Sequence, residues 1–234
     1  GFGARTQQKI LTGIEHLKRY KERHLYSEAL IPAEELLGML RGAPGVLSAS
    51  LAGSIRRGNE TVKDIDLLAA SASPGTLADH FAALPVVESV IAKGETKVSV
   101  VLNSGINCDL RIVSLAEFPY ALHHFTGSRE HNTAMRGRAK QLGFKMNEYG
   151  LFRGEENIPC RSEEDIFRTL GLAFIPLELR ENMGEIEAAE LARVEEAQQE
   201  ALRFGFEIGD LVEEGRAPVG LLHQPATMIS CARV

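Results

Sequence analysis

Residues 53–66 read Gly-Ser-Ile-Arg-Arg-Gly-Asn-Glu-Thr-Val-Lys-Asp-Ile-Asp, and this stretch contains the features that decide the fold. Asp64 and Asp66 stand two residues apart at the start of an apolar run, 65–70, that predicts a β-strand. Because side chains alternate along a strand, both carboxylates face the same side of it. Such carboxylates repel each other unless a cation lies between them, and their hard oxygen atoms suit Mg²⁺. The pair therefore indicates a metal site, although an Asp-x-Asp pair alone is more often a strand end that faces water.

A third carboxylate strengthens the prediction of a metal site. Asp109 lies in the apolar run 107–113, which together with 97–102 flanks Asn-Ser-Gly at 103–105, a hairpin signal. If the strand of Asp109 pairs beside the strand of Asp66, three carboxylates converge. Two metal ions about 4 Å apart can then stabilise both the attacking and the leaving oxygen of a phosphoryl transfer.

The turn before these aspartates supplies groups that bind phosphate. Gly53 and Ser54 follow a predicted strand, 47–52, and offer backbone N–H groups and a hydroxyl. Arg56 and Arg57 add positive charge that suits a triphosphate. Arg57 is the stronger candidate, with a planar guanidinium that can hold phosphate oxygens in two places.

A second segment shows which family the chain resembles. Residues 124–136 read His-Phe-Thr-Gly-Ser-Arg-Glu-His-Asn-Thr-Ala-Met-Arg. Together with residues 53–66, this segment resembles the catalytic signature and the nucleotide-binding helix of DNA polymerase family X, the group that includes DNA polymerase beta. Residues 147–152, 162–167 and 176–181 resemble the bacterial and archaeal branch of that family. The resemblance follows the family order from about residue 1 to about residue 190.

The resemblance implies a template-directed DNA polymerase that fills gaps in DNA repair. Its partners would be a deoxynucleoside triphosphate and gapped or primer-template DNA, and its cofactors two Mg²⁺ ions, which Mn²⁺ could replace. The residues expected to bind both ions and to catalyse the transfer are Asp64, Asp66 and Asp109. The residues expected to bind the nucleotide are Gly53, Ser54, Arg57, His124, Phe125, Gly127 and Asn132. The residues expected to bind DNA are Gly1, Gly3, Arg111 and Arg136.

The resemblance also assigns a role to each nucleotide-binding side chain. Ser54 and Arg57 match residues that hold the β- and γ-phosphates. His124 and Phe125 match the pair that lines the sugar, although many members of the family have Tyr where this chain has His124. Asn132 matches a residue that hydrogen-bonds the edge of the base in the minor groove.

The remaining implied roles concern the primer, the template and the duplex. Asp109 matches the carboxylate that deprotonates or orients the primer 3′-hydroxyl. Arg136 matches an arginine that reaches the template strand, and Arg111 one that pairs with an active-site aspartate in the open state. Residues 1–3 and the predicted helix after them, 5–23, resemble the second half of a helix-hairpin-helix, a clamp on the phosphate backbone.

These features predict an α+β fold, with a nucleotidyltransferase palm made of a small, largely antiparallel mixed sheet and helices on one face. A flanking helical subdomain and a small C-terminal hairpin and helix subdomain complete it. The predicted helices are 5–23, 33–42 opened by Pro32, 76–84, 115–143 interrupted at 126–128, one starting at Ser162, and 185–203. The predicted strands are 47–52, 65–70, 86–91, 97–102 and 107–113, with a short hairpin at 144–153. The expected domains are a helix-hairpin-helix remnant at 1–31, the palm at 32–114, a nucleotide- and template-binding subdomain at 115–182, an acidic linker at 183–215, and a truncated PHP domain or irregular tail at 216–234.

The composition is that of an ordinary globular protein. The chain has 234 residues, of which 44% are hydrophobic and 25% charged, which excludes a collagen-like or wholly disordered chain. No apolar run reaches the roughly 18 residues of a membrane helix. The cysteines, Cys108, Cys160 and Cys231, form no CxxC pair and fit a reducing compartment. Together with these features, the resemblance implies a monomer without membrane partners, in the cytoplasm of a bacterium or archaeon and associated with the nucleoid.

The charge is unevenly distributed. The formal net charge is −6, and residues 178–215 hold twelve Asp and Glu but three Arg. Residues 1–30 hold six Lys and Arg with three Glu, and residues 121–145 five with one Glu. Two basic patches suit a polyanion that is gripped at two places, although the charge alone favours the simpler interpretation of solvated helix faces. We expect the acidic helix 185–203 to face away from DNA.

The ends of the chain indicate a piece of a longer protein. The chain does not begin with Met, and most of the N-terminal helical domain of the family is not in it. Residues 220–225, Gly-Leu-Leu-His-Gln-Pro, begin like the first strand of a PHP phosphoesterase domain, but no second His follows. We therefore expect this chain to have no PHP active site and no 3′–5′ exonuclease activity.

Two other functions remain open. One is a non-templated or small-molecule nucleotidyltransferase with the same Gly-Ser and Asp-x-Asp core. Residues 124–136 argue against it, because the matching element reads a base pair. The other is a catalytically weak protein that only binds DNA gaps.

Overall fold

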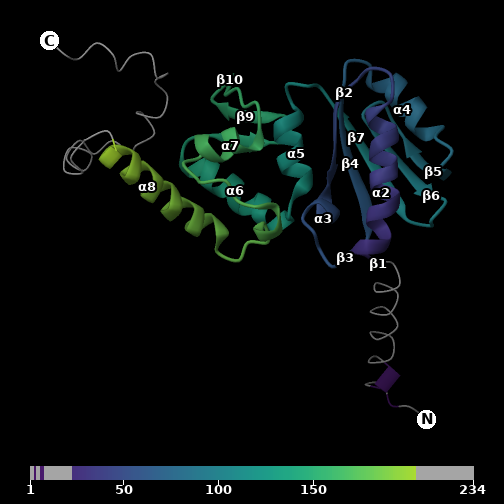
Figure 1. The fold of residues 1–234 in the computed structure, drawn as a ribbon, viewed down its shortest axis with the longest axis horizontal. Helices are drawn as coiled ribbons and strands as arrows, with labels where there is room; N and C mark the ends of the chain where they lie inside the picture. Colours follow the sequence, from purple (N-terminus) through teal and green to yellow (C-terminus); the bar gives the residue numbers. More distant parts are fainter. Residues whose placement is uncertain (1–2, 4–5, 8–22, 204–234) are drawn as a thin grey trace.

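A five-stranded sheet forms one half of the molecule (Figure 1). The computed structural model describes residues 3, 6–7 and 23–203, so the predicted clamp at 1–31 lies largely outside the described residues, and the tail 216–234 does so entirely. The strand order is β2-β4-β7-β6-β5, in which β4 and β7 are parallel and the other neighbours antiparallel. The strands are β2 (Val46–Ala52), β4 (Asp64–Ser71), β5 (Val87–Lys93), β6 (Lys97–Leu102) and β7 (Asn107–Val113). The predicted mixed, largely antiparallel sheet is confirmed.

Helices α2 (Tyr26–Arg41) and α4 (Pro74–Ala82) cover one face of this sheet. Odd-numbered residues of β4, such as Ile65 and Leu67, point into the core beneath the two helices. Because strand side chains alternate, the even-numbered Asp64 and Asp66 lie on the opposite face. The fold thus keeps one face of β4 apolar and leaves the other for polar groups.

The predicted start of α2 was wrong. Pro32 does not open the helix but lies inside it, and the helix begins at Tyr26. The side chain of Glu28 accepts a hydrogen bond from the Leu25 backbone N–H at the start of the helix. A proline inside a helix removes one backbone hydrogen bond. Here the helix persists because Ala29, Ala33, Leu36, Leu37 and Leu40 form a buried stripe against the sheet.

A short helix, α3 (Gly53–Arg56), follows directly from β2. The chain then returns through β3 (Thr61–Val62), which pairs with β1 (His24–Leu25), and enters β4. The stretch 53–66 therefore forms one helical turn, a loop, the short strand β3 and the start of β4.

The second half of the molecule has its own hydrophobic core. Its elements are α5 (Phe118–Thr126), α6 (Arg129–Gln141), β8 (Lys145–Asn147), β9 (Gly150–Arg153), β10 (Glu156–Asn157), α7 (Glu163–Thr169) and the 3₁₀ turn η1 (Leu177–Leu179). Buried Phe167 and Met135 belong to this core, and buried Tyr120 donates a hydrogen bond to the Ile158 carbonyl at 2.5 Å. The predicted helix start at Ser162 is confirmed, because its hydroxyl accepts a hydrogen bond from the Asp165 N–H.

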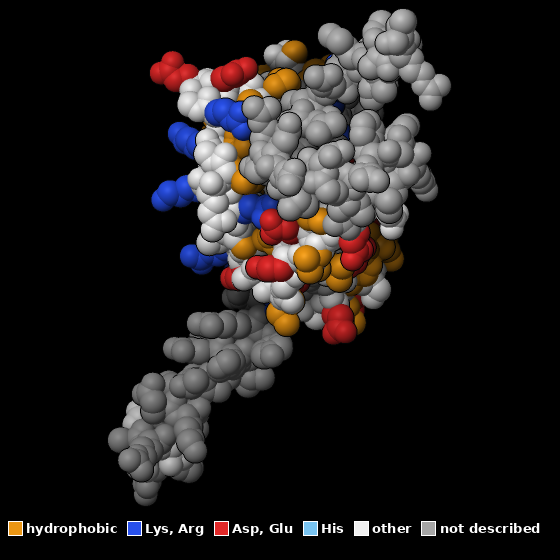
Figure 2. Space-filling model, turned by 90° about the vertical axis from the view of Figure 1, so that its left-hand side faces the viewer, with side chains coloured by type: hydrophobic (Ala, Val, Ile, Leu, Met, Phe, Trp, Pro, Cys, Tyr) orange, Lys and Arg blue, Asp and Glu red, His pale blue; other side chains and the backbone are white. Residues whose placement is uncertain are grey.

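Helix α8 (Glu185–Arg203) projects from this half of the molecule (Figure 1). Buried Ile186 and Ala189 anchor its first turns to the core of this half. Within the described part of the chain, no helix is both long and apolar enough to cross a membrane. Figure 2, which views the α8 end, shows Lys and Arg side chains along one edge of this face.

Candidate active site

The turn between β2 and α3 brings the backbone against the carboxylate of Asp66. Gly53 has φ +60°, and a Cβ atom at this position would overlap the side chain of Asp66. Glycine is therefore required here on two grounds, the left-handed backbone and the close approach. Ser54 follows at the start of the same helical turn and lies half-buried.

Three aspartates share the face of the sheet opposite to α2 and α4. Asp66 and Asp109 are register partners on the parallel strands β4 and β7, and Asp64 is two residues before Asp66. The predicted pairing of these strands is confirmed. The carboxylates therefore lie side by side because of the register of two strands far apart in the sequence.

The electrostatics of the aspartates show how closely they interact. Burial, followed by the charges of Asp64 and Asp109, raises the pKa of Asp66 to about 7. Burial and the charge of Asp109 also raise the pKa of Asp64. Asp109 forms an ion pair with Lys97 of β6, with 2.8 Å between Nζ and Oδ2. Buried carboxylates whose pKa is raised by neighbouring carboxylates form a donor set suited to a hard divalent cation.

The carboxylates of Asp64, Asp66 and Asp109 do not converge on a single metal position. Among the residues that the structure describes, no group of three or more His, Cys, Asp or Glu side chains could hold a metal ion as it stands. Asp109 pairs with Lys97, and Asp66 lies against Gly53. The residue types and their shared face nevertheless fit a hard divalent cation.

A pocket of about 490 Å³ joins the two halves of the molecule beside Asp66. One wall is the turn at the start of α3, and the other is formed by the end of α5 and the start of α6. Its lining includes Gly53, Ser54, Arg57, Asp66, His124, Phe125, Gly127, Asn132, Arg136 and Glu181. Every residue predicted to bind the nucleotide thus lies in this one pocket, together with Arg136.

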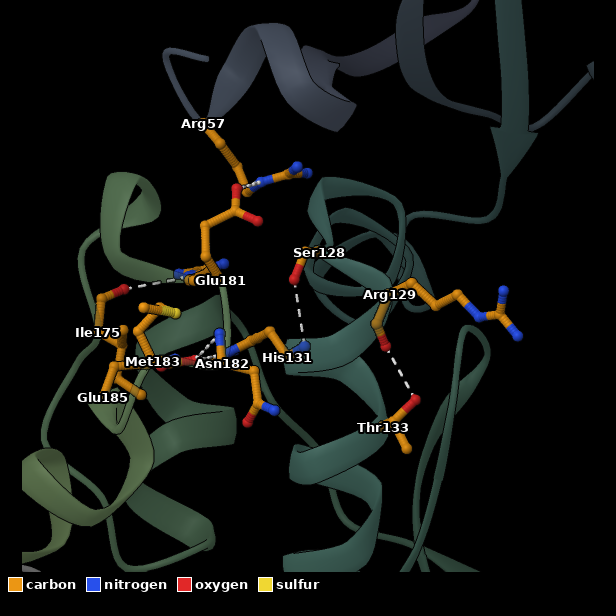
Figure 3. A network of polar contacts seen from close by, with 11 residues as sticks. Arg57, Ser128, Arg129, His131, Thr133, Ile175, Glu181, Asn182, Met183 and Glu185 are labelled. Carbon is orange, nitrogen blue, oxygen red and sulfur yellow. Dashed lines mark hydrogen bonds and ion pairs between the residues drawn. The ribbon is translucent and has the colours of Figure 1, made fainter. Parts of the chain in front are cut away.

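The wall from α5 and α6 is built around the Thr126-Gly127-Ser128 turn. Gly127 has φ +73°, and the Gly127–Ser128 peptide bond is cis. The hydroxyl of Ser128 caps α6 by accepting a hydrogen bond from the His131 N–H (Figure 3). Asn132 donates from Nδ2 to the His124 carbonyl at 2.7 Å, which leaves its Oδ1 without a partner among the described residues. The turn therefore presents a polar amide and an aromatic ring, Phe125, to the same pocket.

The two neighbouring arginines of α3 have different surroundings. Arg56 donates to the Thr126 hydroxyl at 2.6 Å and to the Glu163 carboxylate at 2.5 Å. Arg57 lines the pocket, donating from Nη1 to the Thr126 carbonyl at 2.5 Å and from Nε to Glu181 at 2.7 Å (Figure 3). This difference supports Arg57, rather than Arg56, as the candidate for phosphate binding.

Comparison with known proteins shows which family model and which proteins this chain resembles. Residues 121–181 match the family model described as DNA polymerase beta thumb. The chain is 39% identical over 191 residues to the DNA polymerase/3′-5′ exonuclease PolX of Bacillus subtilis, an alignment that covers 80% of this chain and 34% of that protein. It is 27% identical over 208 residues to DNA polymerase lambda of Rattus norvegicus, covering 74% of this chain and 35% of the relative. A repair DNA polymerase X of African swine fever virus is 28% identical over 130 residues, covering 52% of this chain and 75% of the relative.

These matches support a fragment of a family X DNA polymerase. The chain spans only about a third of the length of the Bacillus and rat proteins that it matches.

Some residues expected from the resemblance to family X lie elsewhere. Arg111 does not pair with an active-site aspartate; its Cζ lies 5.1 Å from the centre of the Phe125 ring, in a second cavity of about 470 Å³. Among the described residues, the cation that pairs with one of the three site aspartates is Lys97, which binds Asp109. Gly1 lies outside the described residues, whereas Gly3 is exposed and its carbonyl accepts hydrogen bonds from the N–H groups of Thr6 and Gln7.

Two residues of the candidate site were missed by sequence reasoning. Glu181 stands 124 positions from Arg57, and Lys97 lies one strand away from Asp109. Neither belongs to a motif with a chemical signature. The one signal that existed for Lys97 was its place in the predicted hairpin, opposite the strand of Asp109.

Proposed function

We propose that this chain is the template-directed polymerase core of a family X enzyme and fills gaps during DNA repair. It would transfer a nucleotidyl group from a deoxynucleoside triphosphate to the primer 3′-hydroxyl and release pyrophosphate. The observation that carries the proposal is the pocket in which the Gly53-Ser54 turn, Arg57 and Asp66 face Phe125 and Asn132. The names of the relatives, repair DNA polymerase X among them, support it.

Asp64, Asp66 and Asp109 are the groups proposed to hold two divalent ions, Mg²⁺ in particular. When bound, the ions would supply charge that stabilises the attacking and the leaving oxygen. Burial, with the charge of Asp109, raises the pKa of Asp64, and burial, with the charges of Asp64 and Asp109, raises the pKa of Asp66; this supports the donor set, because a cation beside these carboxylates would offset the repulsion. Asp109 is the residue proposed to orient the 3′-hydroxyl.

The pocket residues are proposed to bind and orient the nucleotide. Ser54 and Arg57 would hold the β- and γ-phosphates, where Arg57 offers N–H groups in a planar fork. The ring of Phe125 and the side chain of His124 would line the sugar. The buried Oδ1 of Asn132 has no hydrogen-bond partner among the described residues, and Asn132 would face the base edge.

DNA would lie across the exposed basic side of the second half of the molecule. Arg136 lines the pocket and is exposed, and Arg129, Lys140 and Lys145 are also exposed. Such cations bind phosphates at any sequence and give salt-dependent affinity. We propose that the protein acts as a monomer on gapped DNA, in a bacterial or archaeal cytoplasm beside the nucleoid. The proposed domains are the clamp at 1–31, the palm at 32–114, the subdomain that reads the nascent pair at 115–182, and the acidic linker at 183–215.

The test is extension of a primer on a duplex with a one-nucleotide gap in the presence of Mg²⁺. Asp109→Ala should abolish addition. Asp79→Ala is the matched control, because Asp79 is an exposed aspartate of α4 whose ion pair is with Lys93. Loss of addition in Asp109→Ala but not in Asp79→Ala supports the proposal, and equal activity in both variants contradicts it.

A further inference from the structure

Arg57 is already engaged by a negative charge that belongs to the protein itself. Its Nε lies 2.7 Å from Oε1 of Glu181, and its side chain is only 10% exposed. Glu181 lines the same pocket as Ser54 and Asn132. A carboxylate therefore stands where we propose that the phosphates of the nucleotide bind.

The position of Glu181 makes it displaceable. Its side chain is 38% exposed, and among the described residues Arg57 is the one side chain that binds it. A partly exposed ion pair of this kind is worth little, typically below about 1 kcal/mol. A polyphosphate carries several negative charges and can replace the carboxylate on Arg57.

The neighbouring residue, Arg56, forms a more buried ion pair than Arg57 does. Arg56 binds Glu163, which is 6% exposed and also binds fully buried Arg180 at 2.6 Å. The two pairs thus differ in burial and in the number of partners. Arg56 is part of the framework, whereas Arg57 binds the Thr126 carbonyl and a single carboxylate, Glu181, at the edge of the pocket.

The chain before Glu181 is fixed, which limits the movement to its side chain. The carbonyl of Arg180 accepts a hydrogen bond from Ser128 N–H at 3.0 Å, and its Nε donates to the Ile175 carbonyl at 3.1 Å. On the other side, Glu185 accepts hydrogen bonds from the backbone N–H groups of Asn182 and Met183 (Figure 3). Glu181 can therefore swing out without unfolding the segment that carries it.

We propose that Glu181 is a specificity-determining residue of the nucleotide site, an internal competitor that occupies Arg57 until a polyphosphate displaces it. The inference rests on the proposed nucleotide site. Every ligand that uses Arg57 must first displace the carboxylate, so weakly charged anions are excluded and a nucleoside triphosphate is accepted. Removing the competitor should strengthen nucleotide binding, which is the reverse of what a structural ion pair predicts.

The test is nucleotide affinity measured on gapped DNA whose primer lacks the 3′-hydroxyl, so that no turnover occurs. Four variants are compared with the unaltered chain: Glu181→Gln, Arg57→Ala, the double variant, and Glu178→Gln. Glu178 is an exposed glutamate three residues away and serves as the control. Inorganic tripolyphosphate, used as a competitor of the nucleotide, is the second probe.

Glu181→Gln should lower the dissociation constant of the nucleotide about threefold or more and the inhibition constant of tripolyphosphate by the same factor. Arg57→Ala should raise both, and the double variant should match Arg57→Ala, because the competitor acts only through Arg57. Glu178→Gln should match the unaltered chain.

An unchanged or weaker affinity in Glu181→Gln, while Arg57→Ala still weakens binding, would overturn the inference and leave the nucleotide site in place. An Arg57→Ala variant that binds as well as the unaltered chain would contradict both the inference and the proposed site. Glu181→Ala provides a second variant if the Gln side chain keeps the hydrogen bond to Arg57.

Discussion

Asp66 and Asp109 are register partners on two parallel strands, although 42 positions separate them in the chain. Their side chains share the face of the sheet that α2 and α4 leave uncovered. This pairing places the proposed metal-binding carboxylates beside the Gly53 turn and the pocket next to it.

The contact between Gly53 and Asp66 should tolerate no side chain. Gly53→Ala is expected to destabilise the fold by about 2 kcal/mol or more and to abolish nucleotide addition, because the new Cβ would overlap the carboxylate of Asp66. Gly105→Ala is the control, since Gly105 also has positive φ, +80°, but has no heavy atom within 4 Å of the added Cβ. Denaturant unfolding should show a smaller loss for Gly105→Ala, about 1 kcal/mol. Equal losses would mean that backbone strain alone explains the requirement for glycine.

Lys97 should compete with a metal ion for Asp109. Lys97→Met is expected to lower the Mg²⁺ concentration that gives half-maximal primer extension, because the ion pair with Asp109 is removed. Lys93→Met is the control, since Lys93 lies at the sheet edge and pairs with Asp79. A Mg²⁺ requirement that rises in Lys97→Met would show instead that Lys97 assists the reaction.

The buried charges of Arg56, Glu163 and Arg180 should matter most for stability. Glu163→Ala would leave two arginines without their carboxylate, one of them fully buried, and is expected to cost about 3–5 kcal/mol in the free energy of unfolding. Glu164→Ala, an exposed neighbour in the same first turn of α7, should cost less than about 0.5 kcal/mol. Similar values for the two variants, measured by urea unfolding, would show that the network contributes little.

The buried histidine of α5 should make stability depend on pH. Burial, followed by the charges of Arg180 and His131, lowers the pKa of His123 well below its usual value. Below about pH 6.5 the unfolded chain therefore binds a proton that the folded chain does not, so stability falls as pH decreases. His131 acts in the same direction, because burial lowers its pKa although Glu185 opposes the shift.

His123→Leu should flatten the pH dependence between about pH 7 and pH 5. The matched control is His80→Gln, at an exposed position on α4. The measurement is the urea midpoint at several pH values. An unchanged slope in His123→Leu would show that His123 is not the group responsible.

Much of the fold could be predicted because its signals are local. Strand alternation placed Asp64 and Asp66 on one face, a hairpin signal placed 97–102 beside 107–113, and Ser162 marked a helix start. The start of α2 could not be predicted from Pro32, because burial of a stripe against the sheet outweighs the lost hydrogen bond. Local propensity carries no information about that burial.

In the candidate site, too, the residues in local motifs could be predicted, whereas the contacts that depend on tertiary packing could not. The Gly-Ser turn and the Asp-x-Asp pair are short-range patterns with a chemical meaning, and the structure gathers the predicted nucleotide-binding residues in one pocket. The roles of these residues stay predictions. The contact of Glu181 with Arg57 depends on how the two halves of the molecule meet, and a single glutamate carries no signature of such a contact.

The measurement that tests the central claim most directly is single-nucleotide addition to a gapped duplex, with each template base paired with each of the four nucleotides in turn. The account predicts that the added nucleotide follows the template base and that Asp109→Ala adds none of the four. Addition that ignores the template would contradict a templated polymerase and would favour a tailing enzyme with the same carboxylate core. No addition by a folded chain that binds the gap would contradict catalysis by this chain and favour a protein that only binds DNA.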